Sequence, residues 1–112
     1  MLPGGIVTAY NPRSELLAPA QNRDAHRRLR SRLLGAGAKI LPTLALDGDG
    51  RSREWNEPGY LALEITRELL TEIAHALGQN AIVWVDHTGI PTLVAVRPGF
   101  CGARPGDILT IP

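Results

Sequence analysis

The sequence predicts an α+β protein, a two-layer sandwich in which two helices cover one face of a mixed five-stranded sheet. Short β-branched runs bounded by glycine and proline predict the strands, and two segments with apolar residues at three- and four-residue steps predict the helices. The resulting order is β-α-β-β-α-β-β. Two helices are too few to cover both faces of such a sheet, which favours a single helical layer.

The first strand is predicted at residues 5–10 and the first helix at residues 20–35. The strand ends before Asn11-Pro12, because proline lacks the N–H that a strand ladder needs. Pro19 suits the first turn of a helix, where its missing N–H costs nothing. The apolar residues of this helix recur every four positions, at Ala25, Leu29 and Leu33.

A hairpin should follow, with strands at residues 40–46 and 55–63 and a turn-rich loop at residues 47–50. Pro58 should then lie at a sheet edge, at a bulge or at the start of a strand. The second helix should begin after Thr66, whose hydroxyl is suited to capping. Its expected apolar face consists of Leu69, Leu70, Ile73, Ala74 and Leu77.

A second hairpin is predicted at residues 81–85 and 92–96. The remaining tail, residues 97–112, should be mostly irregular, with a short edge strand at residues 108–111. A chain of 112 residues and 12.1 kDa is expected to form one domain over residues 1–112, with its core at about 5–96.

The composition excludes several classes of protein. Aromatic residues make up only 4% of the chain, so the core should consist mainly of aliphatic side chains. Twelve basic and eleven acidic residues leave a net charge of +1, which argues against a strongly basic nucleic-acid-binding protein. No apolar run reaches the ~18 residues of a membrane span, and the N-terminus lacks a basic region followed by an apolar one. No membrane association is expected, and the predicted location is the cytoplasm.

Four features occur in a fixed order along the chain. They are Asn22, ahead of an arginine-rich helix, and the stretches TAYNP at 8–12, EWNEPGY at 54–60 and GQNAIVW at 78–84. From about residue 6 to residue 94, this arrangement resembles the uncharacterised bacterial family DUF3293. The resemblance implies no established activity and no catalytic residues.

The chain departs from the family pattern at both ends. Members usually carry additional sequence before the first motif, and the tail from Arg97 matches no part of them. A site that needs the preceding sequence is expected to be incomplete here.

Amide side chains near the predicted strand ends are candidate ligand contacts, and each also has a structural interpretation. Asn11 either bonds the turn around Pro12 or contacts a ligand at the carboxyl end of a strand. Asn22 lies on the apolar stripe of the first helix, where it is either a clamp to a neighbouring loop or a site residue. Gln79 and Asn80 either cap the second helix or present their carboxamides to a ligand.

Glu57 is the candidate catalytic or anchoring residue. Burial beside Trp55 and Tyr60 would raise its pKa and suit it to general acid or base chemistry. The alternative is an ion pair with Arg51, Arg53 or an arginine of the first helix.

These residues form one pocket hypothesis. A bulge at Pro58 would turn Glu57 toward the ends of the first and fourth strands, where Asn11, Gln79 and Asn80 are expected. Trp55 would supply a stacking wall. The reaction or ligand is not specified by this pattern.

The first helix also carries a cluster of positive charge. Arg23, Arg27 and Arg30 share one face at four- and three-residue spacing. This face is either simply solvated or binds an anionic macromolecule, such as a nucleic acid or an acidic protein. Aromatic residues are absent from it, which argues against a stacking platform for single-stranded nucleic acid.

No metal site is indicated, and the sequence does not specify a cofactor. The spacing of His26, His75 and His87 fits no metal motif, and a lone cysteine, Cys101, cannot form an intrachain disulfide. Phosphate-loop, dinucleotide and nucleophile-elbow motifs are also absent. The placement of the motifs favours a small polar ligand bound around Asn11, Glu57 and Gln79-Asn80 over an anionic partner on the first helix.

Overall fold

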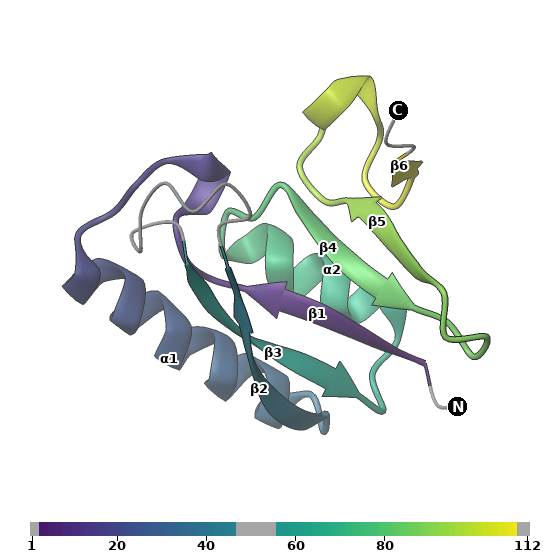
Figure 1. Cartoon of the computed structure of the whole chain (residues 1–112), viewed down its shortest axis with the longest axis horizontal. Coiled ribbons are helices and arrows are strands. Elements are labelled where there is room, and N and C mark those ends of the chain that lie inside the picture. Colours follow the sequence, from purple (N-terminus) through teal and green to yellow (C-terminus); the bar gives the residue numbers. More distant parts are fainter. Residues whose placement is uncertain (1–2, 47–55, 110–112) are drawn as a thin grey trace.

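The structure is a computed structural model that describes residues 3–46 and 56–109. Within them the chain forms six strands and two α-helices (Figure 1). The strands are β1 (Gly4–Thr8), β2 (Lys39–Ala45), β3 (Glu57–Leu63), β4 (Ala81–Val85), β5 (Pro91–Ala95) and β6 (Ile108–Leu109). The helices are α1 (Pro19–Gly35) and α2 (Arg67–Ala76), with 3-10 turns η1 (Pro12–Ser14) and η3 (Phe100–Gly102). Trp55 and the loop predicted at residues 47–50 lie outside the described residues.

The strands form one sheet in the order β2-β3-β1-β4-β5-β6, and every neighbouring pair is antiparallel. The predicted mixed five-stranded sheet is therefore wrong. Each helical connection passes over one strand, so that β3 lies between β1 and β2, and β1 lies between β3 and β4. Strands that point the same way are never neighbours in this split β-α-β arrangement.

The sixth strand comes from the tail. Ile108 pairs with Val94, and Leu109 pairs with Leu93. The edge strand predicted at residues 108–111 is thus confirmed over its described part. The prediction left this strand out of its five-stranded sheet, because so short a segment has no pattern that indicates which strand it pairs with.

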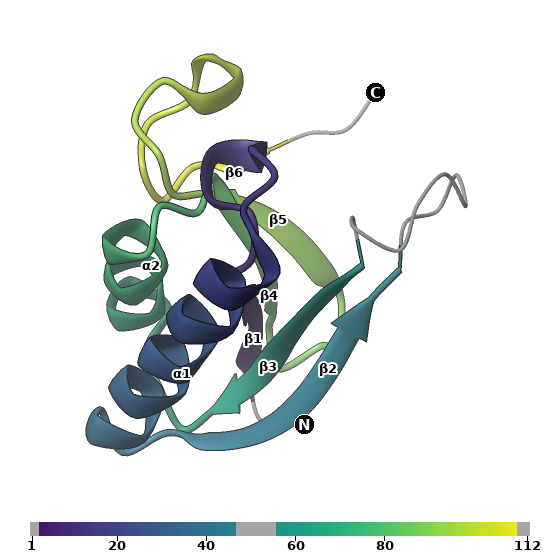
Figure 2. The same ribbon diagram turned by 90° about the vertical axis from the view of Figure 1, so that its left-hand side faces the viewer.

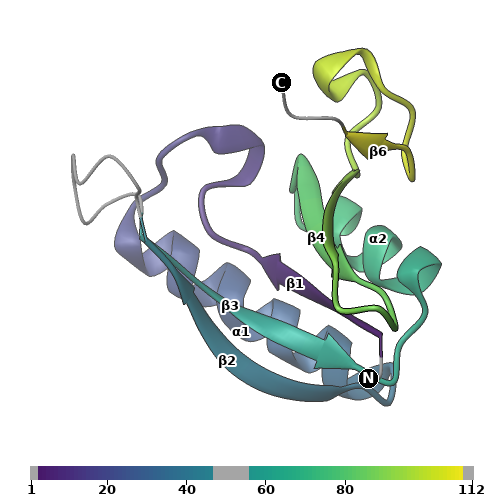
Figure 3. The ribbon, with the colours of Figure 1, turned by 45° about the vertical axis from the view of Figure 1, so that its right-hand side comes forward.

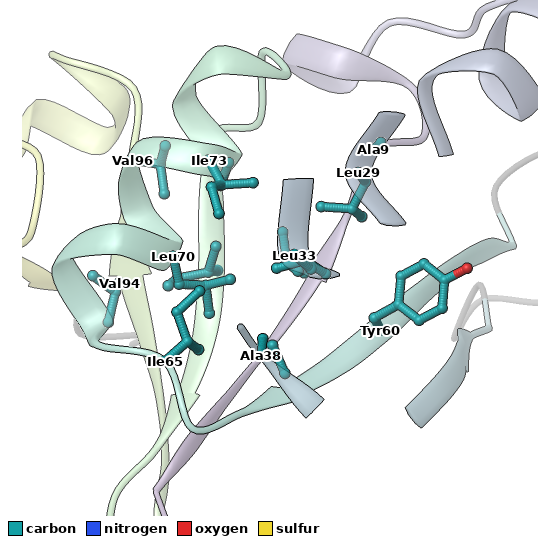
Figure 4. Packing of buried hydrophobic residues seen from close by; sticks show 14 of the residues in the cluster. Ala9, Leu29, Leu33, Ala38, Tyr60, Ile65, Leu70, Ile73, Val94 and Val96 are labelled. Atoms are coloured by element: carbon teal, nitrogen blue, oxygen red, sulfur yellow. The ribbon is translucent and has the colours of Figure 1, made fainter. Parts of the chain in front are cut away.

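Both helices lie on one face of the sheet, as predicted (Figures 2 and 3). The core fills the space between the two layers (Figure 4). Leu29 and Leu33 of α1 and Leu70 of α2 are each 0% exposed. Leu69 was expected beside them but is 37% exposed. Neighbouring helical residues point about 100° apart, so turning Leu70 toward the sheet turns Leu69 outward.

Local capping explains where α2 begins. The Thr66 hydroxyl accepts a hydrogen bond from the backbone N–H of Leu69 at 3.1 Å, which confirms the predicted cap. No described helix has the length and apolarity needed to cross a bilayer.

Pro58 lies near the start of β3, one of the three positions predicted for it, but it forms no bulge. The register runs without interruption through Ala45↔Glu57, Leu44↔Pro58 and Thr43↔Gly59. On the opposite side β1 pairs only as far as Gly59, so Pro58 interrupts no ladder there. The orientation of Glu57 therefore needs another explanation.

Gly5 is where helix and sheet approach most closely. A Cβ atom at this position would lie 2.1 Å from Cδ2 of Leu70 and 3.0 Å from Cε3 of Trp84. The central strand β1 therefore needs a residue without a side chain to let α2 pack against it.

We expect Gly5→Ala to lower the free energy of unfolding by about 1–3 kcal/mol, because the added methyl group overpacks the helix–sheet contact. Urea denaturation measures this loss. Gly35→Ala is the matched control: no heavy atom lies within 4 Å of its added Cβ, so stability should be unchanged or slightly increased. Equal stability of the two variants would contradict the packing argument.

Candidate functional site

The candidate site lies on the face of the sheet that the helices leave uncovered. Val7, Tyr60 and Ile82 point into the core between sheet and helices. Successive strand residues point to opposite faces, so their neighbours Thr8 and Ala81 point away from the helices. The register places Glu57 on the same side, two residues before Gly59, which pairs with Thr8. Strand alternation alone, without a bulge, thus directs Glu57 to this face.

A cavity of about 320 Å³ opens here. Its walls come from the end of β1, the η1 turn, the start of β3, the connection from α2 into β4, and the segments β5 and η3. The lining residues are Thr8, Asn11, Ser14, Glu57, Gln79, Asn80, Ala81, Leu93 and Phe100. The structure therefore brings Asn11, Glu57, Gln79 and Asn80 to one cavity, as the pocket hypothesis requires.

Asn22 belongs to the support of the site and does not line the cavity. Asn11 and Asn22 are 3% and 4% exposed, and their amides are hydrogen-bonded to each other. Oδ1 of Asn22 accepts from the backbone N–H of Asn11 at 2.9 Å, and Nδ2 of Asn22 donates to Oδ1 of Asn11 at 2.9 Å. Oδ1 of Asn11 also accepts from the backbone N–H of Leu17 at 3.1 Å. This geometry supports the interpretation of Asn22 as a clamp to a neighbouring loop.

Asn11 adopts a left-handed backbone conformation, with φ at 46°. Asparagine tolerates this region better than most residues, and the clamp to α1 holds it there. The following η1 turn is then fixed against the end of α2, because the backbone N–H of Arg13 donates to the carbonyl of Gly78 at 2.9 Å. The cavity wall around Asn11 is consequently tied to two helices.

Gln79 and Asn80 carry out different tasks although they are adjacent. Gln79 is 7% exposed, and its Nε2 donates to the carbonyl of Tyr10 at 3.2 Å. Asn80 Nδ2 donates to Oγ of Ser14 at 3.0 Å, while Asn80 Oδ1 is buried and has no hydrogen-bond partner in the described part of the chain. The left-handed residue that ends α2 is Gly78, with φ at 75°, so Asn80 is not needed for that turn.

Glu57 is the one charged side chain among the described residues that line the cavity. Its half-buried position removes water from the carboxylate, and this desolvation raises its pKa above the ordinary value of 4.5. Within residues 3–46 and 56–109 no arginine, lysine or histidine forms an ion pair with it. The alternative partners Arg51 and Arg53 lie outside the described residues, and the α1 arginines do not reach it.

A second, smaller hollow of about 150 Å³ adjoins the cavity. The two share Thr8, Glu57, Ala81 and Leu93. The remaining lining of the second hollow is apolar or small apart from Thr43, and consists of Ile6, Val7, Thr43, Ala45, Gly59, Ile82 and Val83. Glu57 therefore lies between a cavity lined mainly by polar residues and a hollow lined mainly by apolar ones.

Several lining residues are not indicated by the sequence pattern, among them Thr8, Ser14, Leu93 and Phe100. Strand alternation from Val7 could have indicated Thr8, which donates to the carbonyl of Pro58 at 2.8 Å. Phe100 is carried by the η3 turn of the tail, whose sequence has no helical or strand period. The position of Phe100 follows from the pairing of β5 with β6, the strands on either side of this turn, and no sequence pattern indicates that pairing.

The other predicted residues lie away from the cavity. Arg23, Arg27 and Arg30 are exposed on α1, and binding of an anionic partner to them stays a prediction. His26 stacks on Tyr60 with ring centroids 4.8 Å apart, and burial lowers its pKa. No group of three potential metal-binding side chains occurs among the described residues.

We expect Asn22→Ala to lower the free energy of unfolding by about 1–3 kcal/mol, because it leaves the buried N–H of Asn11 without its acceptor. Chemical denaturation measures the loss. Arg23→Ala, at the exposed neighbouring position of the same helix, should change stability by less than about 0.5 kcal/mol. A loss no larger than that of the control would contradict the clamp.

Glu57→Gln should stabilise the protein at pH 7 by up to about 1 kcal/mol, a small gain because solvent still screens the half-buried group. The folded state holds the Glu57 proton more tightly than the unfolded state, so the wild type loses stability as the pH rises from about 4.5 through the folded pKa. The variant lacks this loss, and the two melting temperatures should converge near pH 3.5. A large destabilisation at pH 7 would instead indicate a buried ion pair.

Comparison with known proteins adds one result. A family model described as "Protein of unknown function (DUF3293)" matches residues 7–82. No curated protein and no solved structure matches the chain. The matched region contains the polar residues of the cavity, from Thr8 to Asn80, and excludes Leu93 and Phe100. Since the match covers more than half of the chain, this protein belongs to the DUF3293 family.

Proposed function

We propose that this domain binds a small polar ligand in the cavity, with Glu57 as the polar centre. The observation that carries the proposal is the half-buried Glu57 carboxyl, which has no cationic partner among the described residues and faces a cavity lined by three amide side chains. A carboxylate in such a place is costly unless a ligand or solvent compensates it. The cavity volume of about 320 Å³ falls at the lower end of the range for small-molecule sites.

The lining residues divide into contacts and supports. Glu57 anchors the ligand, and Asn80 lines the same cavity. Asn11 accepts hydrogen bonds from Leu17 and Asn22, and Gln79 donates one to the carbonyl of Tyr10, so these two side chains hold the wall in shape. A carboxyl group with a raised pKa is also suited to proton transfer, but ligand binding is the function that this geometry supports best.

The test is a screen of small amines, amides, alcohols, carboxylic acids and nucleosides by two-dimensional NMR of the labelled protein. Compounds that bind should shift the amide signals of Thr8, Glu57 and Asn80 together. Glu57→Gln should lower the affinity for the tightest-binding compound at least about tenfold, the loss expected when one charge-assisted hydrogen bond is removed.

Glu72→Gln is the matched control, because Glu72 is exposed on α2 and does not line the cavity. It should leave the affinity unchanged. Signals that shift only on α1, or equal binding by both variants, would show that the cavity around Glu57 is not the binding site.

A further inference from the structure

We infer that the ligand is an aliphatic amine, whose ammonium group binds at Glu57 and whose apolar chain lies in the adjoining hollow. This inference rests on the proposed function and adds the chemical class of the ligand. Three features of the two hollows lead to it: their charge, the acceptor character of Glu57 and their apolar lining.

The charge of the site selects the sign of the ligand. Among the described residues, Glu57 is the one ionisable side chain that lines either hollow. No described arginine, lysine or histidine is present to hold a phosphate or a carboxylate there. A carboxylate removed from water favours a cation strongly and repels an anion. An acidic metabolite or a nucleotide is thus a poor occupant.

The hydrogen bonds of the cavity indicate a donor on the ligand. The Thr8 hydroxyl donates to Pro58, and Gln79 Nε2 and Asn80 Nδ2 donate to Tyr10 and Ser14. Each of these three groups thus has a hydrogen bond within the protein. The Glu57 carboxylate has no ion pair with a described residue, and an ionised carboxylate can only accept hydrogen bonds. The three N–H donors of an ammonium group suit it.

The shape of the site indicates an extended apolar part. Glu57 lines both hollows, so a group bound to it has direct access to the second one. That hollow runs across the uncovered face of the sheet past Ile6, Gly59 and Val83. Gly59 has no side chain that could fill this part of the hollow. A Cβ at that position would lie 2.4 Å from the carbonyl oxygen of Val7, so a larger residue would require the backbone to shift. A hollow of about 150 Å³ with this lining has room for a short alkyl chain.

Three probes of equal chain length test the class: hexylamine, hexanol and hexanoate, titrated at pH 7.5 with NMR detection. We expect hexylamine to bind at least about tenfold more tightly than hexanol, as for a hydrogen bond to a charged group, and hexanoate not to bind detectably. Each methylene from ethylamine to hexylamine should tighten binding up to about fourfold, the gain from burying one such group.

A substitution on β2 supplies a sharper test that leaves Glu57 in place. Ala45 is exposed and pairs directly with Glu57 across the two strands. Ala45→Lys therefore puts an ammonium group beside the carboxylate, where directly opposed side chains interact. Ala45 also lines the second hollow, so Ala45→Gln, of similar length without charge, measures the effect of the added bulk. Ala45→Lys should weaken hexylamine binding at least about tenfold more than Ala45→Gln does.

The outcomes separate the two proposals. If hexanol or hexanoate binds in the cavity as tightly as hexylamine, or if Ala45→Lys and Ala45→Gln behave alike, the amine class is wrong while the proposed site stands. If no probe and no compound of the wider screen shifts the cavity signals, the proposed function itself is wrong. Loss of hexylamine binding in Ala45→Lys alone supports both.

Discussion

Two buried amides, Asn11 and Asn22, connect the parts of this molecule that form its cavity. Their mutual hydrogen bonds hold the end of β1 against the first turns of α1. Because Asn11 is fixed in a left-handed conformation, the η1 turn that follows is directed toward Gly78 at the end of α2. Ser14 of that turn then accepts from Asn80 at the start of β4. A chain of short-range contacts thus joins β1, α1, α2 and β4 at this end of the molecule.

The structural and functional interpretations of the amides are complementary. An asparagine that satisfies buried backbone groups cannot move without breaking several bonds, so the cavity wall it forms is rigid. Glu57 is different, because the described protein provides no cation to compensate its charge. The amides around the cavity are hydrogen-bonded within the protein, whereas the charge of the Glu57 carboxylate has no cation beside it in the described residues. This combination is expected at a binding site that lowers the stability of the fold.

The sequence alone predicted the elements well and their neighbours poorly. The helices, the capping residue Thr66 and the strand at residues 81–85 follow from local patterns, and they agree with the structure. The insertion of β3 between β1 and β2 depends on long-range pairing, which no local period encodes. The same limit explains why the edge strand at residues 108–109, although expected, was not counted in the predicted sheet. Leu69 and Leu70 both belong to the predicted apolar face, and which of them contacts the sheet depends on how α2 is turned.

The candidate site was predicted for reasons that were only partly correct. Asn11, Gln79 and Asn80 were chosen because they end or precede strands, and strand ends do meet at this cavity. Glu57 was included through a bulge at Pro58 that does not exist, and ordinary alternation of side chains places it there instead. Phe100 could not be predicted, since its segment has no periodic pattern and reaches the cavity through tertiary contacts alone.

Two parts of the chain form the cavity, and they are held in place by different numbers of contacts. Its polar end is built by residues between Thr8 and Asn80, which are joined to both helices. Its apolar wall includes Leu93 and Phe100, and Phe100 belongs to a turn held mainly by β6 and a few backbone bonds. Substitutions in that turn would reshape the wall without altering the charge or the core. In the proposed site, the size of the cavity can therefore be changed through this turn while Glu57 and the amides are kept.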